Sequence, residues 1–174
     1  GSGVPFVFKL TVMVNKDKGA QRVLPEYVWD YHYLGDELGF KWTALVGTEH
    51  GADMAMAIAA PVKGGGNEFI SDKCVEFMRE NEDQEGKIMI KTDQERSIKL
   101  LVEDLIEKRT EGRTVVEESP VGSKGSNGDV ERMVLAMEGQ IRSWWLGLQS
   151  RLGRKLSSKE RIVAFIPEYA SYLF

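Results

Sequence analysis

The sequence predicts an α/β domain built on a mixed five-stranded sheet, in which three antiparallel strands precede two parallel ones and helices flank both. Two patterns favour this fold class. Strand-like runs with hairpin-length turns dominate the chain up to Ala60, whereas from Phe69 onward short strands alternate with segments of helical periodicity. Because strands that alternate with helices favour parallel pairing, the later strands should add in parallel to the earlier ones. A length of 174 residues suits one domain.

The antiparallel part is predicted from three runs rich in β-branched and aromatic residues, at 27–34, 40–47 and 54–60. The turns between them are short enough for a meander. A further apolar run at 4–14 precedes these strands. It lacks a basic leader and a small-residue cleavage site, so we interpret it as a strand and not as a signal peptide.

The second half is predicted from the change of period. Apolar residues at helical spacing, or in short β-branched runs, indicate a helix at 69–78, a strand at 87–91, a helix at 98–106, a strand at 114–118 and a long helix at 128–151. A last helix is expected within 158–174, with Ser158 as its N-cap and Pro167 as a kink.

Composition limits the chemistry. The 23 basic and 27 acidic residues give a net charge of −4, which argues against a simple basic nucleic-acid-binding module. A single cysteine, Cys74, and two histidines exclude a disulfide framework and a Cys/His zinc site. Carboxylates must therefore hold any metal, which points to a hard cation. Basic charge is concentrated late in the chain, so the acidic balance does not exclude DNA.

Three acids occupy positions where a carboxylate is costly or useful. Asp30 lies inside an apolar strand and shares a face with His32, although an edge-strand acid in contact with water is the plainer interpretation. Asp93 follows the strand at 87–91, at the end where ligands gather in α/β sheets, and helix capping is its alternative. Glu131 lies in the first turn of the long helix, where it would also complement the helix dipole.

A central strand, the end of its neighbour and a packing helix can bring three such carboxylates together. Three carboxylates can hold two Mg²⁺ ions about 3.5–4 Å apart, the arrangement that activates a nucleophile and stabilises the leaving oxygen of a phosphodiester. Other acids compete for the assignment: Asp36, Glu95 and Asp129. His32 could reach a substrate, or it could be a histidine whose hydrogen bonds the sheet satisfies.

Three motifs occur in the order of a known family: Val28-Trp-Asp-Tyr31, Lys91-Thr-Asp-Gln-Glu95, and a Pro- and Gly-rich loop from Ser119 that ends in Asn-Gly-Asp-Val-Glu-Arg132. Over residues 24–174 the chain resembles the catalytic core of retroviral-type integrases, most of all that of copia-like LTR retrotransposons. Two departures stand out. The second and third acids have 37 residues between them, slightly more than the family's usual 35, and Gln-Glu follows Asp93 where the family often has Asn-Gly.

The resemblance implies an RNase H-like fold and a catalytic triad of Asp30, Asp93 and Glu131 that binds two Mg²⁺ or Mn²⁺ ions. It implies 3′-end processing and strand transfer with element ends and target DNA as partners. It also implies a homodimer or larger oligomer in the nucleus. No apolar run of the sequence approaches the length of a membrane span, so we expect no membrane partner. The residues that the resemblance places near DNA are Lys124, Asn127, Gly128 and Arg132.

On the same resemblance, residues 1–23 are an N-terminal extension or a fragment of an upstream region, and the core at 24–174 is truncated at its C-terminus. Two alternatives remain at this stage. One is an RNase H-like nuclease, because water and a DNA 3′-hydroxyl are interchangeable nucleophiles at such a site. The other is a catalytically silent relic that serves as a DNA-binding or dimerisation module.

Overall fold

The computed structural model describes residues 24–35, 41–52, 54–60, 63–92, 94–118 and 128–173, and the structural statements below concern these residues. The strand expected at 4–14 lies outside them. In chain order the elements are β1 (Glu26–Gly35), β2 (Lys41–Glu49), β3 (Met54–Ala59), α1 (Glu68–Glu80), β4 (Ile88–Thr92), α2 (Arg96–Lys108), β5 (Thr114–Glu118), α3 (Gly128–Leu152), the 3₁₀ helix η1 (Arg161–Phe165) and α4 (Ile166–Tyr172).

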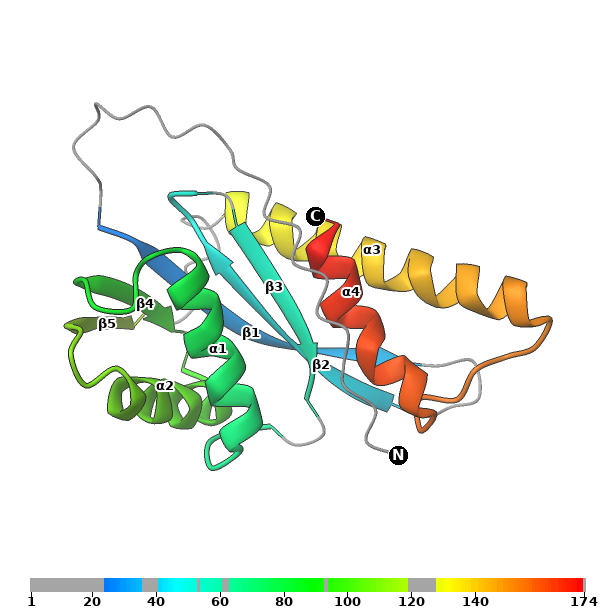
Figure 1. Ribbon diagram of the computed structural model, residues 1–174, viewed down its shortest axis with the longest axis horizontal. Coiled ribbons are helices and arrows are strands. Elements are labelled where there is room, and N and C mark those ends of the chain that lie inside the picture. Colours follow the sequence, from blue (N-terminus) through cyan, green and yellow to red (C-terminus); the bar gives the residue numbers. More distant parts are fainter. Residues whose placement is uncertain are drawn as a thin grey trace, which may run out of the picture.

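The strands form one five-stranded sheet in the order β3-β2-β1-β4-β5 (Figure 1). β1, β2 and β3 pair antiparallel, and β4 joins β1 and β5 in parallel, so the predicted mixed sheet is confirmed. β1 is the central strand, with β2 on one side and β4 on the other. The interpretation of Asp30 as an edge-strand acid is therefore wrong.

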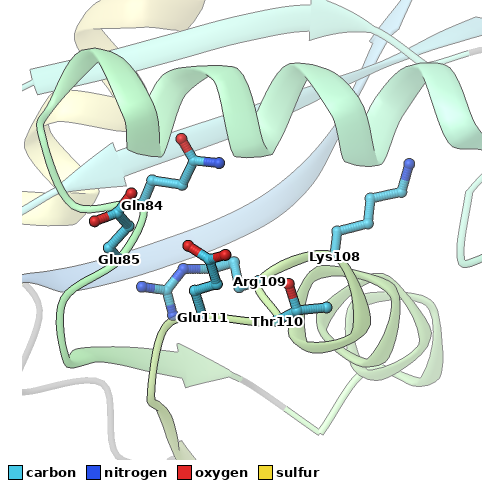
Figure 2. A pocket seen from close by; sticks show the side chains of 6 residues that line it. All are labelled: Gln84, Glu85, Lys108, Arg109, Thr110 and Glu111. Carbon is cyan, nitrogen blue, oxygen red and sulfur yellow. The ribbon is translucent and has the colours of Figure 1, made fainter.

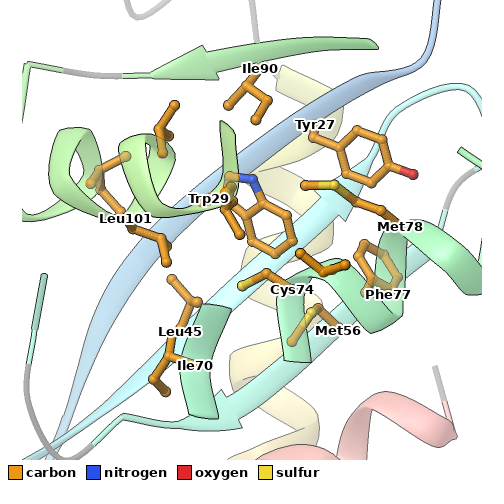
Figure 3. Close-up of a cluster of buried hydrophobic side chains, with 14 of the residues drawn as sticks. Tyr27, Trp29, Leu45, Met56, Ile70, Cys74, Phe77, Met78, Ile90 and Leu101 are labelled. Carbon is orange, nitrogen blue, oxygen red and sulfur yellow. The ribbon is translucent and has the colours of Figure 1, made fainter. Parts of the chain in front are cut away.

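One face of the sheet packs against α1 and α2 (Figure 3). Tyr27, Trp29 and Tyr31 of β1 are buried there, as the alternation along the strand predicts. The Tyr27 and Trp29 rings stack with their centroids 6.1 Å apart, and Phe77 of α1 meets both rings edge-on. Cys74 of α1 belongs to the same cluster, where burial raises the pKa of its thiol and makes it an inert core residue.

The opposite face packs against α3, η1 and α4. Small side chains line it on β2 and β3, among them Ala44 and Ala57, and Met137 and Ile141 of α3 pack onto them. Figure 1 shows α1 and α2 in green on one side, and α3 and α4 in yellow to red on the other. None of the helices in the described segments is long and apolar enough to cross a membrane.

The C-terminal region differs from the prediction of one helix from Ser158. The chain leaves α3 through Gly153, whose φ of +64° suits glycine, and the next helical turn is the 3₁₀ helix from Arg161. Between them Leu156 is fully buried and Arg154 pairs with Glu160 at 2.8 Å, so burial of Leu156 and a local ion pair hold this segment. Pro167 lies in the first turn of α4, where its missing N–H costs nothing, and does not kink a longer helix.

The fit of Trp29 against β2 gives a testable prediction. A Cβ at Gly47 would overlap the Trp29 indole, which is almost completely buried and has no room to move. We expect Gly47→Ala to lower the free energy of unfolding by about 1–3 kcal/mol, as overpacking does. Urea denaturation followed by tryptophan fluorescence would measure this.

Gly139→Ala is the matched control, because a Cβ at this position of α3 would meet nothing within 4 Å. Replacing a helical glycine there should raise stability by up to about 1 kcal/mol. Equal effects of the two substitutions would contradict the packing described for Trp29.

Candidate active site

Asp30 lies in the middle of β1, on the face that α3 covers. Its neighbours along the strand, Trp29 and Tyr31, point into the aromatic cluster on the opposite face, so the strand's alternation directs Asp30 away from that cluster. The side chain keeps 45% of its surface exposed. A carboxylate at this position is thus solvated on one side, while its backbone pairs with Val46 of β2.

His32 lies two residues further along β1 and contacts two carboxylates. Its Nδ1 is 2.7 Å from Oε1 of Glu138 on α3, and its Nε2 is 3.3 Å from Oδ2 of Asp30. The first distance is that of a close polar contact between the ring and a carboxylate. The second is within ion-pair range without hydrogen-bond geometry, and Nε2 is buried without a hydrogen-bond partner in the described part of the chain. The ring is therefore held more firmly on the Glu138 side than on the Asp30 side.

Glu131 lies in the first turns of α3, and its side chain is exposed. Glu138 follows it by seven residues, so the two acids lie on the same helix face, about 10.5 Å apart along the axis. Sequence reasoning placed His32 on the Asp30 face but missed Glu138. The signal that could have found Glu138 is this seven-residue spacing, together with the core positions Met137 and Ile141 that flank it.

The structure describes only some of the other predicted site residues. Gly128 is the first residue of α3, and Arg132 is exposed in its first turns. Asp93, Lys124 and Asn127 lie outside the described residues, as do the competing Asp36 and the side chain of Asp129. Within the described ranges, no three His, Cys, Asp or Glu side chains are arranged to hold a metal ion.

Glu95, a competing acid, is engaged elsewhere. Its carboxylate accepts hydrogen bonds from Lys63 at 2.8 Å and from Ser97, and these two donors hold the pKa of Glu95 below its usual value. The ammonium of Lys63 also lies over the Tyr33 ring, 4.1 Å from its centroid, and Gly64 N–H donates to the hydroxyl of Tyr31. Glu95 thus fastens the connector between β3 and α1 to the start of α2.

A polar pocket lies at the end of the sheet where β4 and β5 begin (Figure 2). It is lined by Gln84, Glu85, Lys108, Arg109, Thr110 and Glu111. The buried Arg109 donates to the carbonyl oxygens of Asp83 and Gly86, both at 2.8 Å, and the Tyr27 hydroxyl donates to the Asp83 carboxylate. These groups join α2 to the loop before β4, which is a structural role.

Comparison with known proteins gives a fold. No protein-family model matches the chain, and no curated protein sequence does. Among solved structures, the chain is similar to the HTLV-2 integrase catalytic core domain in complex with magnesium (trimeric form). The TM-score is 0.52 and the identity 13%, over 87% of this chain and 86% of that one.

It is also similar to a chain of the simian T-cell lymphotropic virus intasome in complex with PP2A regulatory subunit B56 gamma, with a TM-score of 0.50 and 10% identity. That similarity covers 88% of this chain and 49% of the other. Together with the strand order, these similarities confirm the predicted RNase H-like fold.

The contacts of Glu95 predict how it differs from a metal ligand. Glu95→Gln should lower stability by less than about 1 kcal/mol, since the ion pair is partly exposed, and should speed hydrogen exchange at Gly64 and its neighbours. The binding of added Mn²⁺ to the Glu95→Gln variant should equal that of the unsubstituted chain. Glu103→Gln, an exposed acid on α2, is the control and should change neither property. A loss of Mn²⁺ binding in Glu95→Gln would instead identify this acid as a metal ligand.

Proposed function

We propose that this chain is the catalytic core of a metal-dependent DNA polynucleotidyl transferase of the integrase type. The observation that carries the proposal is the position of Asp30. It is a solvated carboxylate in the centre of the sheet, on the face covered by the helix that carries Glu131. Asp93 is the third acid of the proposed site.

The register of the central strands supports the inclusion of Asp93. Paired residues of β1 and β4 differ by 63 in number, as in Glu26 with Met89 and Tyr27 with Ile90. Asp30 and Asp93 are also 63 positions apart. Since the two strands are parallel neighbours, this equality is what two acids that meet across a strand pair require.

The donor set suits a hard divalent cation. Asp30 and Glu131 offer carboxylate oxygens from exposed or half-exposed side chains, and oxygen ligands are those that Mg²⁺ and Mn²⁺ prefer. Two bound ions would supply activation of the attacking oxygen and charge stabilisation on the leaving oxygen of a phosphodiester. In this proposal the acidic residues of the protein hold the ions.

DNA is the proposed substrate, both as element ends and as target. Arg132, one position after Glu131, is exposed and is a candidate for phosphate contact, and Lys124, Asn127 and Gly128 are proposed to act in the adjoining loop. The similar HTLV-2 core was solved with magnesium and in a trimeric form, and we extend to this chain the use of a divalent metal and self-association. A homodimer or larger assembly in the nucleus is part of the proposal.

Substitution of each acid tests the proposal. Asp30→Asn, Asp93→Asn and Glu131→Gln should each abolish Mg²⁺-dependent cleavage or joining of labelled DNA ends, because each removes a charged ligand while keeping the side chain's shape. Gel analysis of the products separates hydrolysis from strand transfer. Cleavage without joining by the unsubstituted chain would favour the nuclease alternative.

The competing acids serve as controls. Asp36→Asn and Asp129→Asn should keep Mg²⁺-dependent activity. Full activity in Asp30→Asn, or its loss in Asp129→Asn and not in Glu131→Gln, would overturn the assignment of the triad.

A further inference from the structure

We propose that Glu138, acting through the imidazole of His32, is the positioning residue that holds Asp30 in its metal-binding orientation. The inference rests on the proposed function, because it concerns the same site. It adds two residues, Glu138 and His32, which with Asp30 form a series of contacts from α3 to the central strand.

The distances and exposures indicate which of the three side chains positions the others. His32 and Glu138 are mostly buried, with 17% and 22% of their side-chain surfaces exposed, whereas Asp30 keeps 45%. Glu138 is 2.7 Å from His32 Nδ1, and Asp30 is 3.3 Å from Nε2. The contact between Glu138 and His32 is thus both shorter and less exposed than the contact between His32 and Asp30. Glu138 therefore anchors the ring, and the ring in turn guides Asp30.

The imidazole transmits this orientation because it is rigid and planar. Fixing Nδ1 on one carboxylate fixes the direction in which Nε2 points, since a flip of the ring would place carbon atoms where both nitrogens now lie. Nε2 then lies 3.3 Å from Oδ2 of Asp30, so the nearby ring limits the positions of this oxygen and with it the rotation of the carboxylate. Carboxylate partners of this kind commonly orient the groups of a metal site.

The surroundings of Glu138 make it a firm anchor. Met137 and Ile141, on either side of it along α3, are fully buried against the sheet, so the helix cannot shift without breaking the apolar cluster. On the strand side, Ala44 pairs with His32 in the β1–β2 register. Its small side chain leaves room for the imidazole between β1 and α3.

The same contact links the helix that carries Glu131 to the strand that carries Asp30. Glu131 is two helical turns before Glu138, and Asp30 is two residues before His32 on β1. The buried Met137 and Ile141 hold α3 in place, and the contact between Glu138 and His32 joins it to β1. This one contact therefore bears on two of the three proposed metal ligands.

Binding of Mn²⁺ alone to the full chain, followed by electron paramagnetic resonance, tests the inference without reference to catalysis. We expect Glu138→Gln to weaken Mn²⁺ binding about 10-fold, the lower end of what loss of a supporting carboxylate causes. His32→Ala should weaken it at least as much. The double variant should bind no more weakly than His32→Ala, because Glu138 acts through the ring. Glu103→Gln should bind like the unsubstituted chain.

Thermal melts accompany each binding measurement, since a merely structural role would lower the melting temperature and leave the Mn²⁺ affinity of the folded protein intact. If Glu138→Gln does not fold, Glu138→Asp replaces it, because it keeps the charge but withdraws it from Nδ1, and the same loss is expected. Mn²⁺ affinity within two-fold of the unsubstituted chain, or additive losses in the double variant, would overturn the inference.

Asp30→Asn separates the two proposals. If Asp30→Asn loses Mn²⁺ binding and Glu138→Gln retains it, the inference fails and the proposed site stands. If Asp30→Asn binds Mn²⁺ as well as the unsubstituted chain, the proposed site fails and the inference fails with it.

Discussion

The rest of the structure depends on the alternation of side chains along β1. Because β1 is the central strand, both of its faces are covered, and they have opposite chemistry: aromatic rings toward α1 and α2, and Asp30 and His32 toward α3. A slip of the strand by one residue would drive Asp30 into the aromatic cluster, at a cost of several kcal/mol. The aromatic residues thus fix the direction of the acid as firmly as any contact made by the acid itself.

The neighbouring strand is shaped to match. Gly47 pairs with Trp29 in the register, and the indole occupies the space that a side chain there would need. On the other face Ala44 pairs with His32 and leaves room for the imidazole beneath α3. Trp29 and His32 of β1 therefore meet small residues of β2, one on each face, and this complementarity makes room for both side chains beneath the helices.

The parts of the fold that the sequence predicts are those with strong periodicity. The strands and the long helix follow from patterns that extend over many residues, and the parallel addition of β4 follows from alternation of strands with helices. The region after α3 could not be predicted in this way, because it has no periodic pattern and is held by the burial of Leu156 in the apolar cluster. The same holds for Glu138: its spacing from Glu131 is visible in the sequence, but its contact with His32 requires the placement of α3.

Similarity of 10–13% in identity with preserved architecture has a physical basis in this arrangement. The apolar clusters tolerate substitutions that keep volume and pattern, so the sheet and its helices persist while their residues change. A fold preserved in this way does not by itself carry an activity, which resides in particular side chains. Here Asp30, His32 and Glu138 project from the middle of a central strand and from a helix anchored by buried residues. Their relative positions therefore depend on the two apolar clusters and not on loops.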